Sequence, residues 1–136
     1  MTKFDDLLTG QQVRKHRKRP SHLEDKLQMA CVRWFELQYK QYAIYLHHSP
    51  NGGYRTPAEA SIFKSMGTRA GFPDLLLFLP NQYYCFMGIE LKVGTNKQSP
   101  AQLQMQQAFE SVGAKYVVVR SLEEFMDVVE TYMRMR

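Results

Sequence analysis

The sequence predicts an α/β fold in which one mixed sheet is flanked by helices, in the order αβαββαβα. Segments whose apolar residues have helical spacing alternate with short runs that are rich in β-branched and aromatic residues. Two of these apolar runs meet at a turn and favour a hairpin. A chain of 136 residues is long enough for one core and too short for a second. We therefore expect one domain over residues 21–136, preceded by a leader at 1–20.

The first helix is predicted from Ser21 to about residue 40. Ser21 is a candidate N-cap, and Glu24 three residues later completes the pattern of a capping box. Apolar residues then recur at spacings of three and four. The run YAIYL at 42–46 alternates and is predicted to be a strand, which ends in the loop 49–53.

The remaining helices carry clear start and stop signals. A helix over 57–66 begins with Pro57 and stops at Gly67, and a third helix follows Ser99 and runs over 100–112. The run KYVVVR at 115–120 is predicted to be a buried strand. The last helix follows Ser121 as its cap.

Between the second and third helices, the runs 74–79 and 84–92 are predicted to pair as a hairpin through a loop at 81–83. This register sets Asp74 directly opposite Glu90, with Cβ atoms roughly 5 Å apart. Two carboxylates that close repel each other unless a cation lies between them. Side chains alternate along a strand, so Glu90 and Lys92 share one face. The pattern favours a divalent-metal site, and a solvated strand end is the alternative.

The net charge of +5 comes from the leader, where five basic residues lie within six positions. A flexible basic arm that contacts a phosphate backbone and a merely solubilising segment both fit this run. The leader cations are Arg14, Lys15, Arg17, Lys18 and Arg19.

No apolar stretch approaches the roughly 20 residues of a membrane span, and the N-terminus lacks a secretory-signal pattern. Cys31 and Cys85 have no metal-ligand spacing and are predicted to be small core residues. We expect a soluble, cytoplasmic protein with no membrane partner.

The chain resembles the virus-type replication-repair nuclease (VRR-NUC) domain, a branch of the PD-(D/E)xK nuclease superfamily, over about residues 21–120. The matching parts, in chain order, are Glu24, Pro50 to Gly53 with Arg55, Gly67, Gly71-x-Pro73-Asp74, Glu90-x-Lys92, and Ser99-Pro100-x-Gln102. The resemblance implies a restriction-endonuclease-like core. Small stand-alone domains of this family look like phage products, for which the compartment is the host-cell cytoplasm.

The resemblance also implies the roles of the site residues. Asp74 and Glu90 are expected to hold Mg²⁺, or Mn²⁺ as a substitute, with the main-chain carbonyl of Leu91 as a third ligand. Glu24 is expected to reach the metal directly or through water, and its alternative is to close the capping box with Ser21. The cation lowers the pKa of an attacking water and neutralises charge on the scissile phosphate.

Lys92 is expected to position that water or to stabilise charge on the phosphate, and its alternative is a surface salt bridge with Glu90. Gln102, in the first turn of its helix, is expected to bond Lys92 or nucleic acid, and a plain exposed residue is its alternative. A histidine-metal site at His47 and His48 is not expected, because adjacent residues of a strand point in opposite directions. Candidate phosphate contacts are Asn51, Arg55, Lys64, Arg69 and Lys97, in addition to the leader cations.

The expected function is that of a Mg²⁺-dependent DNA endonuclease without an organic cofactor, leaving a 5′-phosphate and a 3′-hydroxyl. Branched DNA is the expected substrate, cut by a homodimer that resembles a Holliday-junction resolvase, because a junction needs two symmetric incisions. One rival is a monomeric flap or nicking nuclease. The other is a DNA-binding module without catalysis, which would not need the intact acids and lysine.

Overall fold

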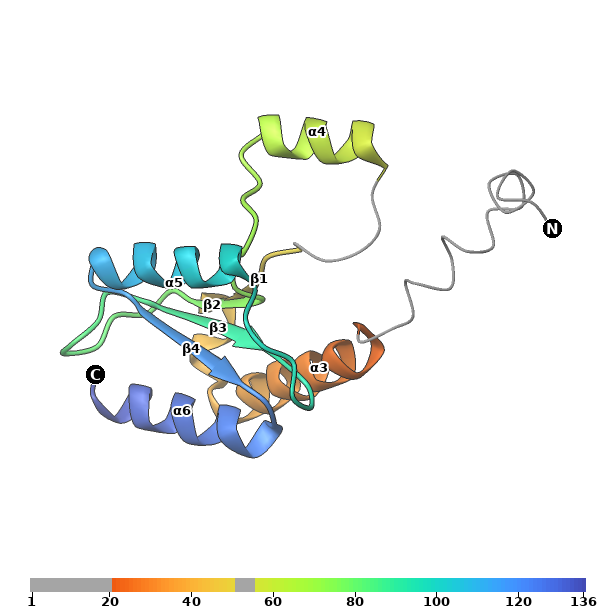
Figure 1. Ribbon diagram of the computed structural model, residues 1–136. Coiled ribbons are helices and arrows are strands. Elements are labelled where there is room, and N and C mark those ends of the chain that lie inside the picture. Colours follow the sequence, from red (N-terminus) through yellow and green to blue (C-terminus); the bar gives the residue numbers. More distant parts are fainter. Residues whose placement is uncertain (1–20, 51–55) are drawn as a thin grey trace.

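A computed structural model describes residues 21–50 and 56–136, except for the side chain of Ser21 (Figure 1). Its elements are α3 (Ser21–Gln38), the 3₁₀-helix η1 (Lys40–Tyr45), β1 (Leu46–His48), α4 (Pro57–Ser65), β2 (Leu75–Leu77), β3 (Met87–Leu91), α5 (Pro100–Ser111), β4 (Lys115–Val119) and α6 (Leu122–Arg134). Helices and strands follow one another in the predicted order, and η1 is an addition to it. None of the helices in these ranges is long and apolar enough to cross a membrane.

The four strands form one mixed sheet in the order β1-β2-β3-β4. The first two pairs are antiparallel, while β3 and β4 run parallel and are connected through α5. Helices α3 and α6 cover one face of the sheet and α5 covers the other (Figure 1). The prediction of a mixed sheet flanked by helices is therefore confirmed.

Each face of the sheet carries its own apolar cluster. The larger cluster contains Cys31 and Phe35 of α3, Ile89 of β3, and Phe125 and Val129 of α6, all with fully buried side chains. On the other face, Phe109 of α5 packs over the sheet with Leu76, Ala114 and Tyr116. Strands β2 and β3 are buried along their whole length, as expected for strands covered on both faces.

The predicted register of the hairpin is confirmed, although its loop is longer than predicted. Leu75 pairs with Ile89 and Leu77 with Met87, which is the register that sets Asp74 opposite Glu90. The connection spans 78–86, because strand pairing ends at Leu77 and resumes only at Met87. Within it, the side-chain oxygen of Asn81 stabilises a turn by accepting hydrogen bonds from the backbone N–H groups of residues 83 and 84.

The predicted strand at 42–46 is wrong. After α3 the chain continues to turn, and the N–H of Tyr42 donates to the carbonyl of Tyr39 at 2.9 Å. A 3₁₀ turn places residues three apart on one side, so both tyrosines pack against the core while Ile44 is 84% exposed. The strand begins only at Leu46.

Some apolar residues lie at the surface. Leu23 and Leu37 of α3 are both more than half exposed, because the buried stripe is narrow and centred on Cys31 and Phe35. Cys85 is exposed rather than a core residue, because it lies in the connection before β3 begins.

Helix α4 forms where predicted but adds nothing to the core. Thr56 is its N-cap in a capping box with Glu59, and Pro57 opens its first turn. None of its residues is buried. In Figure 1 the helix stands apart from the layers of the sheet.

Candidate active site

Asp74 and Glu90 meet at one end of the sheet because of the hairpin register. Asp74 directly precedes β2, and Glu90 is the fourth residue of β3. The side chains of the two acids hydrogen-bond to each other. Asp74 is fixed from a second side, since its Oδ2 accepts the N–H of Leu91 at 2.7 Å. The predicted pair of opposed carboxyl groups is thus present.

The backbone of Asp74 is bonded to β1. Its carbonyl oxygen accepts the N–H of Ser49 at 3.1 Å and lies 2.9 Å from Nδ1 of His48. His48, which we did not expect to ligate a metal, therefore contacts the site through its ring. This contact fixes the segment from which the Asp74 carboxylate projects.

Glu90 is a nearly inaccessible carboxyl group, 3% exposed, with both oxygens engaged. Oε1 accepts from Nε2 of Gln102 at 2.9 Å, and Oε2 accepts from the hydroxyl of Tyr116 at 3.1 Å. Burial, followed by the charge of Asp74 and the hydrogen bond with it, raises the pKa of Glu90 from 4.5 to about 8. Glu90 therefore holds its proton near neutral pH when no cation is bound.

Gln102 reaches Glu90 because it is part of a helix cap. The N–H of Ser99 donates to Oε1 of Gln102 at 2.8 Å, which leaves the amide nitrogen free to point at Glu90. The partner is Glu90 rather than the expected Lys92 or nucleic acid. The cap of α5 thus determines the direction of the Glu90 carboxyl group.

The glycine before the Pro73-Asp74 pair permits this close approach. Gly71 has a φ of +78°, and a Cβ there would lie 2.3 Å from the carbonyl oxygen of Ala101 in the first turn of α5. Any side chain at this position would push the segment away from α5. The distance between Asp74 and Gln102 would then increase.

Glu24 joins the same end of the sheet from the first turn of α3. Its carboxyl group accepts a hydrogen bond from the N–H of Val93, just beyond β3. Burial raises the pKa of Glu24, the positive charge of Lys92 lowers it, and the charge of Asp74 raises it again. Glu24 therefore faces Asp74 and Lys92, while a capping role with the Ser21 side chain lies outside the described atoms.

Lys92 and the Leu91 carbonyl lie beside the acids. The N–H of Lys92 donates to the carbonyl of Val119 in β4 at 3.0 Å. Backbone groups alternate in direction along a strand, so the N–H and C=O of Leu91 point to the opposite side, where Asp74 lies. The positive charge of Lys92 lowers the pKa of Glu90, against the larger effect of burial.

The donor set fits a hard divalent cation held mainly by two carboxylates. Within residues 21–50 and 56–136, no three or more His, Cys, Asp and Glu side chains form a ready metal cage. Mg²⁺ does not require one, because it keeps several waters and binds through one or two carboxylates together with substrate phosphates. Asp74, Glu90 and the Leu91 carbonyl supply oxygen donors, and burial followed by the charge of Asp74 raises the pKa of Glu90.

The sequence-predicted phosphate contacts are only partly described. Lys64, Arg69 and Lys97 are exposed. Lys64 belongs to α4 and Arg69 to the segment that follows it, and both line a hollow next to Gly71. Lys97 lies in the connection between β3 and α5. The remaining candidates lie outside the described residues: Arg14, Lys15, Arg17, Lys18, Arg19, Asn51 and Arg55.

Sequence reasoning missed Tyr116. It stands in the run KYVVV as the one residue with a hydroxyl among buried apolar neighbours. A buried tyrosine hydroxyl usually finds a hydrogen-bond partner, which was the available signal. The position of that partner depends on the parallel pairing of β3 with β4, which sets Gly88 beside Tyr116.

The family model of the VRR-NUC domain matches residues 14–123 of this chain. Among solved structures, a protein described as a "VRR_NUC domain protein" aligns with a TM-score of 0.73 and 29% sequence identity. The alignment covers 82% of this chain and 88% of that chain. No curated protein sequence matches the chain.

Proposed function

Because this chain belongs to the VRR-NUC domain family, nucleases of the PD-(D/E)xK type that act on DNA, we propose that it is a divalent-metal-dependent endonuclease that cuts branched DNA. The observation that carries the proposal is the pairing of the partly buried Asp74 with the buried Glu90. Two carboxyl groups in hydrogen-bond contact, one of them with a pKa raised to about 8, form a site that gains stability from a cation.

In this proposal Asp74, Glu90 and the Leu91 carbonyl hold Mg²⁺ or Mn²⁺, and Glu24 contributes directly or through water. When bound, the cation would neutralise charge on the scissile phosphate and lower the pKa of the attacking water. Lys92 binds a non-bridging phosphate oxygen and orients the nucleophile. These residues form the catalytic set of the domain over 21–136.

Gln102 and Tyr116 act as positioning residues through Glu90. Each donates to one oxygen of its carboxyl group, which holds the plane of that group and leaves a second lone pair on each oxygen for the cation. The same two hydrogen bonds stabilise the ionised form of Glu90 that a metal requires.

The preference for branched DNA is supported by the small size of the domain and by its surface. A junction needs two incisions, and one chain carries one site, so we propose a two-fold homodimer. Exposed apolar side chains are available for an interface, including Leu23, Met29 and Leu37 on α3 and Ile44 on η1. The basic leader and the exposed cations Lys64, Arg69 and Lys97 are proposed to bind phosphates.

The test is a cleavage panel of single-stranded, duplex, flap and four-way DNA with Mg²⁺ or Mn²⁺. We expect incision of the four-way substrate, products with a 5′-phosphate, no incision in chelator, and loss of incision in Asp74→Asn. The matched control is Asp127→Asn, an exposed aspartate of α6. Full activity of Asp74→Asn would refute the assigned site, and a strictly monomeric enzyme that prefers flaps would refute the junction substrate.

A further inference from the structure

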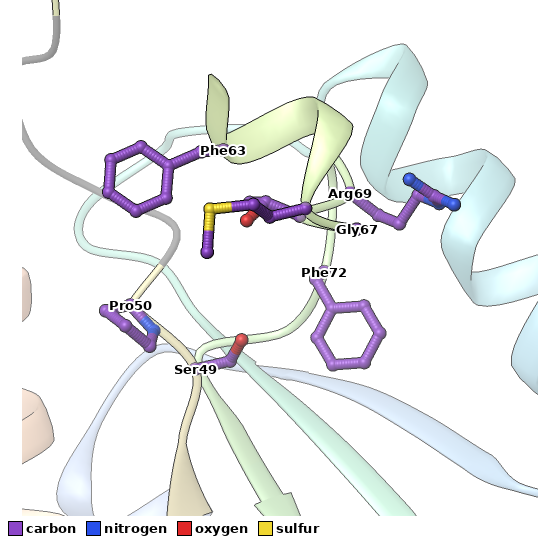
Figure 2. Close-up of a pocket in the computed structure, with 8 residues that line it drawn as sticks. Ser49, Pro50, Phe63, Gly67, Arg69 and Phe72 are labelled. Carbon is purple, nitrogen blue, oxygen red and sulfur yellow. The ribbon is translucent and has the colours of Figure 1, made fainter. Parts of the chain in front are cut away.

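Two adjoining hollows lie beside the candidate active site, where α4, the end of β1 and the segment 66–72 meet (Figure 2). Their volumes are about 350 and 440 Å³. Both values fall in the range of roughly 300–1,000 Å³ that is usual for small-molecule sites. The two hollows share Phe63, Thr68 and Arg69, and the catalytic set uses none of these residues.

The first hollow is lined by aromatic rings. Figure 2 shows Phe63 of α4 on one side of the hollow and Phe72 on the other, with Pro50 and Ser49 just after the end of β1. The Phe72 ring is oriented by an edge-to-face contact with Phe109, at a centroid distance of 5.6 Å. Phe63 is 38% exposed, so a ligand can cover it.

The second hollow adds positive charge. Lys64 and Arg69 line it, and no carboxylate is among the described residues that line either hollow. Aromatic rings next to cationic side chains are the combination with which proteins bind unpaired nucleotides, because every base can stack and every nucleotide carries a phosphate.

The first hollow adjoins the backbone of Asp74, the acid that we assign to catalysis. Ser49 lines the first hollow, and its N–H donates to the carbonyl of Asp74 at 3.1 Å. Phe72 lies two residues before Asp74 in the chain. A DNA strand with one phosphate at Asp74 and Glu90 therefore has a neighbouring nucleotide within reach of the rings.

We propose that the first hollow receives one unpaired nucleobase next to the phosphate that is cut, stacked on Phe63, while Lys64 and Arg69 bind the adjoining phosphate. The inference rests on the proposed nuclease function and specifies its substrate: a branch point with an unpaired nucleotide is preferred to fully paired arms. A base that is already unpaired enters such a site at least cost, because no pairing has to be broken.

The test measures binding in the Glu90→Gln background, which removes turnover. The probe is a duplex with one unpaired 2-aminopurine, compared with a fully paired duplex and with an abasic residue at the unpaired position. We expect a change of fluorescence on binding and weaker binding of the paired and abasic DNA. Phe63→Ala should weaken binding of the unpaired probe by about 5- to 150-fold, the range found for one stacked base.

Matched variants separate stacking from structure. Phe63→Trp should retain the preference because it keeps an aromatic face. Ile62→Ala is the control, since Ile62 is 59% exposed on the same helix and lines neither hollow. Helix α4 has no buried residue, so both alanine variants should fold, which circular dichroism checks.

Equal binding of abasic and base-containing probes, or equal effects of Phe63→Ala and Ile62→Ala, would overturn the inference. A change of oligomer mass in Phe63→Ala would assign the hollow to a second copy of the chain and would also overturn it. The nuclease proposal is tested separately, by cleavage of four-way DNA with wild-type protein and Mn²⁺. Cleavage without any response of the probe would refute only the base site.

Discussion

Replacing Glu90 by glutamine should stabilise the metal-free protein, and by more as the pH rises. Glutamine has the shape of the protonated carboxyl group. Its oxygen still accepts from Gln102 and its amide can donate to Asp74, while the hydrogen bond that the Tyr116 hydroxyl donates to Glu90 is lost. What the change removes is the cost of ionising a group that is 3% exposed and lies beside a second acid.

The size and sign of the effect follow from the pKa of Glu90, raised from 4.5 to about 8. Below pH 4.5 the group holds its proton in both folded and unfolded chains, so the contribution of Glu90 to the free energy of unfolding is at its maximum. Between pH 4.5 and about 8 the unfolded chain releases a proton that the folded chain retains. The free energy of unfolding then falls by about 1.4 kcal/mol per pH unit, to a total loss of about 5 kcal/mol as an upper limit.

The assay is urea unfolding of wild type and Glu90→Gln at several pH values from 5 to 9, in chelator. The difference in the free energy of unfolding should grow across this range in favour of the variant. Glu110→Gln, which changes an exposed glutamate of α5, should show no such growth. Saturating Mn²⁺ should reverse the order at pH 8, since only the wild type binds it through this carboxylate. A difference that is independent of pH would refute the reasoning.

Four further changes test other parts of the proposal. Lys92→Ala should keep Mn²⁺ affinity within a few-fold but lose turnover, and a collapse of metal affinity would make Lys92 structural. Tyr116→Phe removes one donor to Glu90 and should weaken Mn²⁺ binding about 10- to 100-fold, so unchanged affinity contradicts its positioning role. Deleting residues 1–19 should flatten the salt dependence of DNA binding by close to one unit of log–log slope per lost phosphate contact. Turnover at saturating DNA should be preserved, and an unchanged slope would mean that the leader does not contact DNA. Light scattering should give about twice the chain mass of 15.9 kDa, and a mixed dimer with one Asp74→Asn subunit should nick a four-way junction only once, whereas two incisions would argue against one site per subunit.

Local signals were sufficient wherever the chemistry of a few adjacent residues decides the structure. The capping residues Ser99 and Ser121 begin α5 and α6 as predicted. The hairpin register was predicted from a loop at 81–83, and the register is confirmed although the connection spans 78–86. Sequence alone therefore placed Asp74 opposite Glu90, although it did not predict the length of the loop.

Sequence reasoning failed where residues that are distant in the chain determine the local structure. The run at 42–46 has the composition of a strand, yet Tyr39 and Tyr42 pack better from a 3₁₀ turn against the side of α3. This packing leaves no periodic trace in the sequence.

The sequence by itself singled out the acids and the lysine that we propose for the chemistry, because they stand at the ends of apolar strands. Only the tertiary structure decided the environment of those residues. Tyr116 reaches Glu90 through the parallel pairing of β3 and β4, Gln102 reaches it from the cap of α5, and Glu24 meets Val93 across the end of the sheet. The pKa of Glu90 depends on burial, on Asp74 and on the hydrogen bond with Tyr116, and only the packed chain brings these groups together.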